Sequence, residues 1–157
     1  MRTQKAIMYC YIGLSVGVLV SGVLSQLFKP RIKVVAAYLI FTVFVVGLYL
    51  FTMDGKSPAY FYFICTLLGI GTGYWALFVT VAAEQFGTNI RSTVTNTVPN
   101  FVRGSLIPIS KSFVYLVAPL GMLTSGIVVG SICLALAFLS TIFLKESFGK
   151  DLNYMEQ

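Results

Sequence analysis

Five runs of apolar residues, each long enough to cross a lipid bilayer as a helix, constrain this chain more than any other feature. The runs cover residues 6–28, 34–53, 59–83, 92–117 and 122–144. About 20 helical residues cross a hydrocarbon core of about 30 Å. We therefore predict an all-α fold, an integral membrane helical bundle of five transmembrane helices. Residues 1–157 form a single transmembrane domain in this prediction, with the lipid bilayer as its surroundings.

The composition supports a membrane location. Only 10% of the 157 residues are charged and 57% are hydrophobic, whereas soluble domains carry about 25% charged residues. A chain this short cannot bury so much apolar surface in its own core, so that surface must face lipid. The net charge of +6 fits short basic loops that orient a membrane protein, and we expect no nucleic-acid partner.

The sequence has few residues of the kinds that bind metals or cofactors. Histidine is absent, and the three cysteines, Cys10, Cys65 and Cys133, lie far apart within apolar runs. None belongs to a CxxC pair, so we expect no metal site, no disulfide framework and no cofactor. The spans also lack an internal acid. A membrane-embedded enzyme needs paired acids, a nucleophile with its base, or a metal, and we reject that class.

Small residues predict where helices pack closely. Gly13, Gly17, Ser21 and Ser25 recur at every fourth position of the first run, a pattern that lets another helix approach. This run is longer than the apolar part of a signal peptide and lacks a small-residue cleavage site, so we expect it to be retained. The third run contains a glycine-rich segment, residues 69–73, without the Lys-Ser/Thr of a phosphate loop. It predicts close packing or a local bend.

The loops predict the orientation. Segment 29–33 is a tight loop with three positive charges and no acid, which is typical of a cytoplasmic loop. The hinge 84–91 and the polar tail 145–157 lie on the same side if the five spans alternate, and the turns 54–58 and 118–121 lie outside. We therefore expect the N-terminus outside and the C-terminus in the cytoplasm, with a bacterial inner (plasma) membrane as the location.

The fourth run carries a polar stripe. At 100° per residue, five polar side chains fall within an arc of roughly 80°: Thr93, Asn96, Asn100, Arg103 and Lys111. An arginine in the middle of a span is costly unless it faces a polar interior. Arg103 therefore either lines a solute cavity or pairs with a carboxylate elsewhere in the protein, and both explanations stay open. Tyr74 and Trp75 of the third run are further cavity candidates.

Three motifs occur in a characteristic order. Segment 22–33 looks like a glycine-and-basic loop between two helices, with Gly22, Arg31 and Lys33 in place and Gln26 where aspartate is usual. Segment 84–91 is similar to a Glu-x-Phe/Leu-Pro-Thr-x-x-Arg element, from Glu84 to Arg91, with glycine in place of proline. Together with the tail 145–150, these motifs resemble the C-terminal half of a major facilitator superfamily transporter, helices eight to twelve.

This resemblance implies a function and a missing partner. Members of that family have twelve helices in two halves and bind solute near the midplane. The chain would then be a fragment of a secondary-active transporter with alternating access. Its substrate would be a small polar or anionic solute such as a sugar or organic acid, and it would work with a missing N-terminal half. The alternative is a small standalone membrane subunit that packs with a larger membrane partner.

Overall fold

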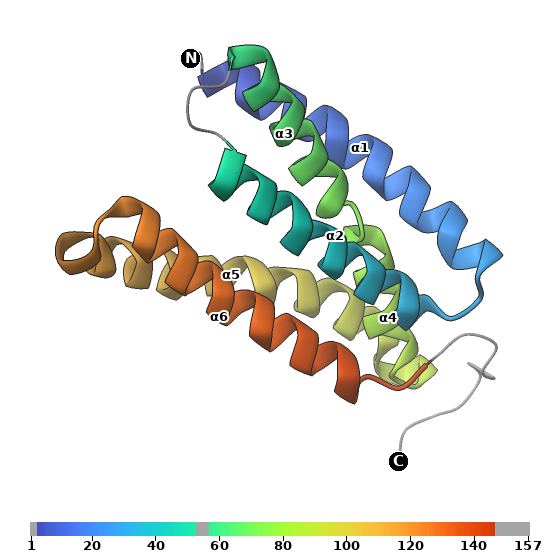
Figure 1. Ribbon diagram of the computed structural model, residues 1–157. Helices are drawn as coiled ribbons and strands as arrows, with labels where there is room; N and C mark the ends of the chain where they lie inside the picture. Colours follow the sequence, from blue (N-terminus) through green and yellow to red (C-terminus); the bar gives the residue numbers. More distant parts are fainter. Residues whose placement is uncertain (1–2, 53–56, 147–157) are drawn as a thin grey trace. The chain divides into compact units, whose positions relative to one another are not determined.

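The computed structural model describes residues 3–52 and 57–146. Residues 147–157 of the predicted cytoplasmic tail and residues 54–56 of the predicted turn at 54–58 lie outside these residues. The described part is helical apart from short connections, and it contains no strand. The helices are α1 (Thr3–Leu27), α2 (Arg31–Thr52), α3 (Pro58–Gly71), α4 (Trp75–Glu84), α5 (Thr88–Leu120) and α6 (Met122–Phe143) (Figure 1).

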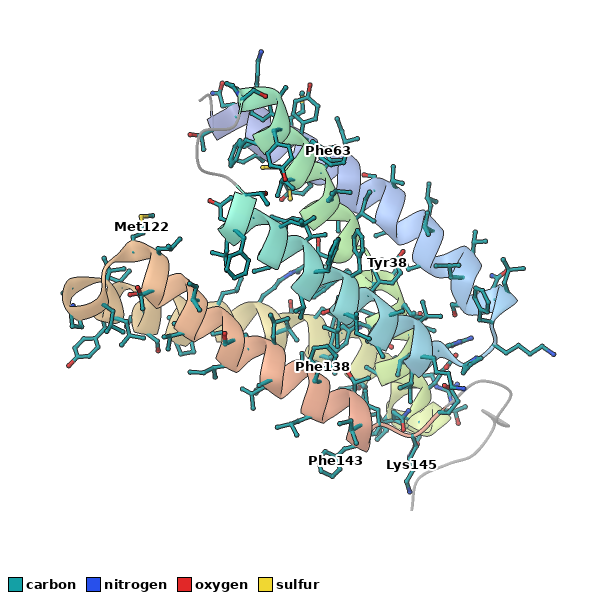
Figure 2. All side chains as sticks on the ribbon, in the orientation of Figure 1. Tyr38, Phe63, Met122, Phe138, Phe143 and Lys145 are labelled. Carbon is teal, nitrogen blue, oxygen red and sulfur yellow. The ribbon has the colours of Figure 1, made fainter. Side chains whose placement is uncertain are left out.

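The five predicted apolar spans are confirmed as helices. The helices α1, α2, α5 and α6, and the segment Pro58–Glu84 that contains α3 and α4, are each long and apolar enough to cross a membrane. Large apolar side chains point outward: Phe51 is 90% exposed and Phe143 is 82% exposed. Figure 2 shows Phe63, Met122 and Phe143 projecting away from their helices. An apolar exterior of this extent needs lipid around it, which indicates an integral membrane protein.

Three boundaries differ from the predictions. Residues 31–33 form the first turn of α2 and not a loop, because a helix can begin directly after a proline such as Pro30. The predicted hinge 84–91 is shorter, since α5 already begins at Thr88. The predicted outer turn at 118–121 shrinks to Gly121, whose φ of 77° is a left-handed value that glycine adopts without a steric penalty.

The chain divides into two compact units. One contains Met1–Val81 and Lys145–Lys150, and the other contains Ala82–Leu144 and Asp151–Gln157. Among the described residues, the first unit holds α1, α2, α3 and most of α4, and the second holds α5 and α6. Each unit is described separately below.

The closest packing in the first unit is between α1 and α3. The buried residues of α1 are Gly13, Gly17, Ser21 and Ser25, which are the four members of the predicted small-residue row. A methyl group added at Gly13 would lie 2.1 Å from the Thr66 carbonyl oxygen, and one added at Gly17 would lie 2.5 Å from that of Ile70. The two backbones therefore touch, and the predicted packing role of this row is confirmed.

Glycines of the third span complete this contact. A methyl group at Gly69 would lie 2.0 Å from the Cys10 carbonyl oxygen, and one at Gly73 would lie 2.3 Å from the Gly17 carbonyl carbon. Ascending positions on α1 thus meet ascending positions on α3, so the two helices run in the same direction (Figure 1). Two spans separated by one intervening span also cross a membrane in the same direction.

Hydroxyl groups attach α2 to this pair. The Tyr38 hydroxyl donates to the Gly17 carbonyl oxygen at 3.0 Å, and Figure 2 marks Tyr38 on α2. Near the other end of α2, the Thr52 and Tyr60 hydroxyl oxygens lie 2.6 Å apart in a hydrogen bond. A glycine carbonyl is reachable by a neighbouring side chain because no Cβ covers it. Each hydrogen bond thus joins two spans, and it pairs polar groups for which the lipid acyl chains offer no hydrogen-bond partner.

The second unit is a helical hairpin. The helices α5 and α6 are joined at Gly121 and pack against each other, with the Phe113 ring 3.8 Å from the position of a methyl group at Gly126. Ser125 is fully buried, and its hydroxyl donates to the Gly121 carbonyl oxygen at 2.7 Å. Pro99, Pro108 and Pro119 all lie within the continuous helix α5.

We predict that Gly17→Ala destabilises the first unit by about 1–3 kcal/mol, because the added methyl group meets backbone atoms that cannot move away easily. Gly22→Ala is the matched control on the same helix, since nothing lies within 4 Å of its added methyl group. The control should be neutral or slightly stabilising because alanine favours helix formation. Thermal unfolding of both variants in detergent tests this, and equal melting temperatures would contradict it.

Candidate functional site

The third span is interrupted at residues 72–74. The Thr72 N–H bonds to the carbonyl oxygens of Leu68 at 3.1 Å and Gly69 at 3.2 Å, and the Gly73 N–H donates to Ile70 at 2.9 Å. These bonds tighten the last turn of α3, and α4 restarts at Trp75. The glycine-rich segment therefore packs closely, which confirms that part of the prediction, and it interrupts the helix.

Two neighbouring helices supply the hydrogen bonds that the interruption needs. The Ser21 hydroxyl of α1 lies 3.0 Å from the Gly73 carbonyl oxygen and 2.9 Å from the Val18 carbonyl oxygen of its own helix, so these two acceptors share its one proton. The Thr42 hydroxyl of α2 is shared in the same way between the carbonyl oxygens of Gly71 at 3.0 Å and Tyr38 at 2.8 Å. Irregular backbone is tolerated at membrane depth only where protein or a polar cavity satisfies its polar groups. Serine and threonine on facing helices fulfil this requirement here.

Tyr74 and Trp75 flank this interruption. The Tyr74 ring is half-buried and lies 6.3 Å from the Tyr38 ring, centroid to centroid. Trp75 is 37% exposed and its ring lies 5.7 Å from that of Phe78. Both side chains thus have packing partners inside the first unit. Their predicted place in a solute cavity stays a prediction.

All five residues of the polar stripe on α5 are exposed: Thr93, Asn96, Asn100, Arg103 and Lys111. The half-buried residues of α5 recur at every third or fourth position, among them Val98, Val102, Ser105, Ile109, Phe113 and Leu116. At 100° per residue, the centre of this half-buried row lies about 170° around the helix from the centre of the stripe. Phe113 of that row touches α6. The stripe therefore occupies the face of α5 that is turned away from its hairpin partner.

The amide groups of the stripe have fixed orientations. Asn96 Nδ2 donates to the Ser92 carbonyl oxygen at 3.1 Å, and Asn100 Nδ2 donates to the Asn96 carbonyl oxygen at 3.0 Å. Only an amide nitrogen can donate to a carbonyl, so each side-chain oxygen must take the other position. Among the described residues, 3–52 and 57–146, no residue forms a hydrogen bond or an ion pair with the Arg103 side chain. The stripe thus presents one guanidinium group together with one oxygen acceptor and the second Nδ2 N–H of each amide.

Lys111 is separated from the rest of the stripe. Ile107 lies within the same arc, between Arg103 and Lys111, and is 64% exposed. Lys111 instead lines a shallow depression of about 370 Å³ with Ser110, Val114 and Tyr115. The structure therefore brings Asn96, Asn100 and Arg103 together on neighbouring turns, and Lys111 lies about 12 Å further along the helix axis.

The residues of the two loop motifs occupy helix ends. Arg31 and Lys33 lie in the first turn of α2, Glu84 ends α4 and Arg91 lies in the first turn of α5. Arg91 Nη2 donates to the Phe86 carbonyl oxygen at 3.1 Å, within its own connection. Gly22 and Gln26 are exposed on α1. Whether these residues act as a motif stays a prediction.

The sequence did not predict that Glu146 caps the N-terminus of α2. Its Oε1 accepts from the Arg31 N–H at 3.1 Å and its Oε2 accepts from the Ile32 N–H at 3.2 Å. These are the first N–H groups of α2, which have no partner within the helix. Pro30 precedes them and has no side-chain oxygen to cap them. The missing local cap was visible in the sequence, but its distant replacement was not.

Comparisons with family models, curated proteins and solved structures found no match to this chain. Over the described ranges, no group of three or more His, Cys, Asp or Glu side chains is placed to hold a metal ion.

We predict that Ser21→Ala destabilises the first unit by about 1 kcal/mol, because it leaves the buried Gly73 carbonyl without its interhelical donor. Ser15→Ala is the matched control: among the described residues, its hydroxyl bonds only to the Tyr11 carbonyl oxygen of its own helix turn. Thermal unfolding in detergent compares the two variants. A control as unstable as Ser21→Ala would show that the interhelical bond is not the cause.

Glu146 variants should loosen the start of α2. Glu146→Ala removes both acceptor oxygens, and loss of a helix cap costs about 0.5–2 kcal/mol. Glu146→Gln keeps one acceptor oxygen and should have an intermediate effect. Hydrogen–deuterium exchange of the segment that starts at Arg31 measures the opening. We expect the rate to increase from wild type to the glutamine variant to the alanine variant, and unchanged exchange in all three would refute the capping role.

Proposed function

We propose that this chain is part of a secondary-active solute transporter of the major facilitator type, and that the Asn96–Asn100–Arg103 face of α5 lines its solute pathway. The observation that carries the proposal is the placement of this face. It carries an arginine in the middle of a span, it is exposed, and it is turned away from the half-buried side of its helix. Such a face is costly against acyl chains, so water or protein must cover it.

The interrupted third span supports the same proposal. Discontinuous helices recur in transporters, where unwound backbone lies near the solute or ion site. Here the hydroxyl groups of Ser21 and Thr42, from two neighbouring helices, stabilise the interruption. The interruption is therefore built into the fold.

The connections are consistent with alternating spans. The loop before α2 and the residue Glu146 after α6 are separated by four spans, and alternation places them on one side of the membrane. The bonds from the Arg31 and Ile32 N–H groups to Glu146 support that common side. We propose that this is the cytoplasmic side of a bacterial inner membrane, and that the five spans work with a further set of helices that lies across the solute pathway from the polar face of α5.

Cysteine labelling tests whether this face is wet. In a variant with Cys10, Cys65 and Cys133 replaced by alanine, we would introduce Asn96→Cys, Asn100→Cys or Arg103→Cys, one at a time. Phe101→Cys is the control, because Phe101 is 78% exposed but lies about 160° around the helix from Arg103. We expect a membrane-impermeant thiol reagent to label the three stripe positions in the complete protein and to leave the control unlabelled.

Two outcomes contradict the proposal. Unlabelled stripe positions in a folded protein would mean that protein covers this face, which favours a subunit that packs with a larger partner. Labelling of the Phe101→Cys control at the same rate would mean that α5 lies in water on all sides and does not span a membrane.

A further inference from the structure

We infer that the solute recognised by the α5 face is a hydroxylated monocarboxylate, an acid whose hydroxyl groups lie on several carbons. This inference rests on the proposed function and narrows its substrate class. Its basis is the hydrogen-bonding and charged groups that the structure leaves available at Asn96, Asn100 and Arg103.

The amide orientation sets which hydrogen-bonding groups the solute must supply. The Asn96 and Asn100 Nδ2 atoms donate to backbone carbonyls one turn earlier, so the side-chain oxygens are left to face outward. An amide oxygen accepts hydrogen bonds and cannot donate them. Each Nδ2 also keeps a second N–H, so the solute needs groups that both donate and accept at two positions one helical turn apart, about 6 Å along the axis. Hydroxyl groups on separate carbons meet this requirement.

The guanidinium group sets the charge. Arg103 lies one turn beyond Asn100, and side chains in a helix lean back toward its N-terminus, which brings the guanidinium toward the two amides. A guanidinium matches a carboxylate with two parallel hydrogen bonds. No acid occurs between Thr88 and Leu120, so α5 itself does not neutralise Arg103. A cationic solute would be repelled at this position.

Competing solute classes fit less well. A neutral sugar leaves the guanidinium without an anion, and an alkyl carboxylate leaves the amide oxygens without donors. An α-amino acid has its donors on one atom, next to its carboxylate, so it cannot reach both amides. A sugar phosphate carries a second charge, and the next cation on the helix, Lys111, lies beyond the exposed Ile107.

The test is uptake by the complete protein in proteoliposomes. The probes are D-gluconate, D-glucose, hexanoate, L-alanine and glucose 6-phosphate, and the variants are Asn96→Leu, Asn100→Leu and Arg103→Gln. We expect D-gluconate to be transported and to compete most strongly. Each asparagine variant should raise its KM by about 3- to 10-fold, as loss of one neutral hydrogen bond does. Arg103→Gln should lower its uptake by at least about 100-fold, and Ser112→Ala, on the opposite side of α5, should leave it unchanged.

Hexanoate inhibition separates recognition from a general loss of folding. Hexanoate has the carboxylate but no hydroxyl groups, so the two asparagine variants should not change its inhibition constant, and Arg103→Gln should abolish inhibition. Equal effects on D-gluconate and hexanoate would overturn the role of the amides. Transport of another probe in preference to D-gluconate, or of none of the five, would overturn the substrate class. Cysteine labelling of the stripe would still stand in that case, so the failure of this inference is distinguishable from that of the proposed function.

Discussion

Direct contact between two helix backbones is the constraint on which the first unit depends. Gly13 and Gly17 of α1 meet Gly69 and Gly73 of the third span so closely that none of the four positions has room for a methyl group. In lipid, the hydrophobic effect does not drive helices together, so close packing and interhelical hydrogen bonds must do so. Glycine provides both, because its absence of a Cβ allows contact and uncovers its carbonyl group.

The same contact makes the interrupted helix possible. The approach of α1 to Gly73 brings Ser21 within 3.0 Å of the Gly73 carbonyl oxygen, and α2 contributes Thr42 to Gly71 in the same way. Without these donors, the interruption would expose unsatisfied backbone to hydrocarbon. Close packing and the interrupted span thus follow from one arrangement, in which hydroxyl groups of α1 and α2 satisfy the backbone carbonyls of the interruption.

The second unit has a different character. Its long helix α5 has no buried residue, and its half-buried row accounts for one side only. The opposite side carries two amides and a guanidinium, which need water or polar protein around them in a membrane. This hairpin therefore depends on whatever covers that side far more than the first unit depends on its surroundings.

The sequence by itself determined the five spans, the small-residue row and the polar stripe, because hydrophobicity, residue size and helical period are local properties. It also predicted a bend at the glycine-rich segment. It placed some helix ends wrongly by up to four residues, at Arg31 and Thr88 among others, since charged residues can belong to a loop or to the first turn of a helix.

Only the tertiary structure decided which groups meet across the chain. It paired Ser21 with Gly73 and brought Glu146 to the start of α2. These contacts join residues more than 50 positions apart, and no local pattern encodes such a pairing. They arise because packed helices leave each buried polar group few partners within reach.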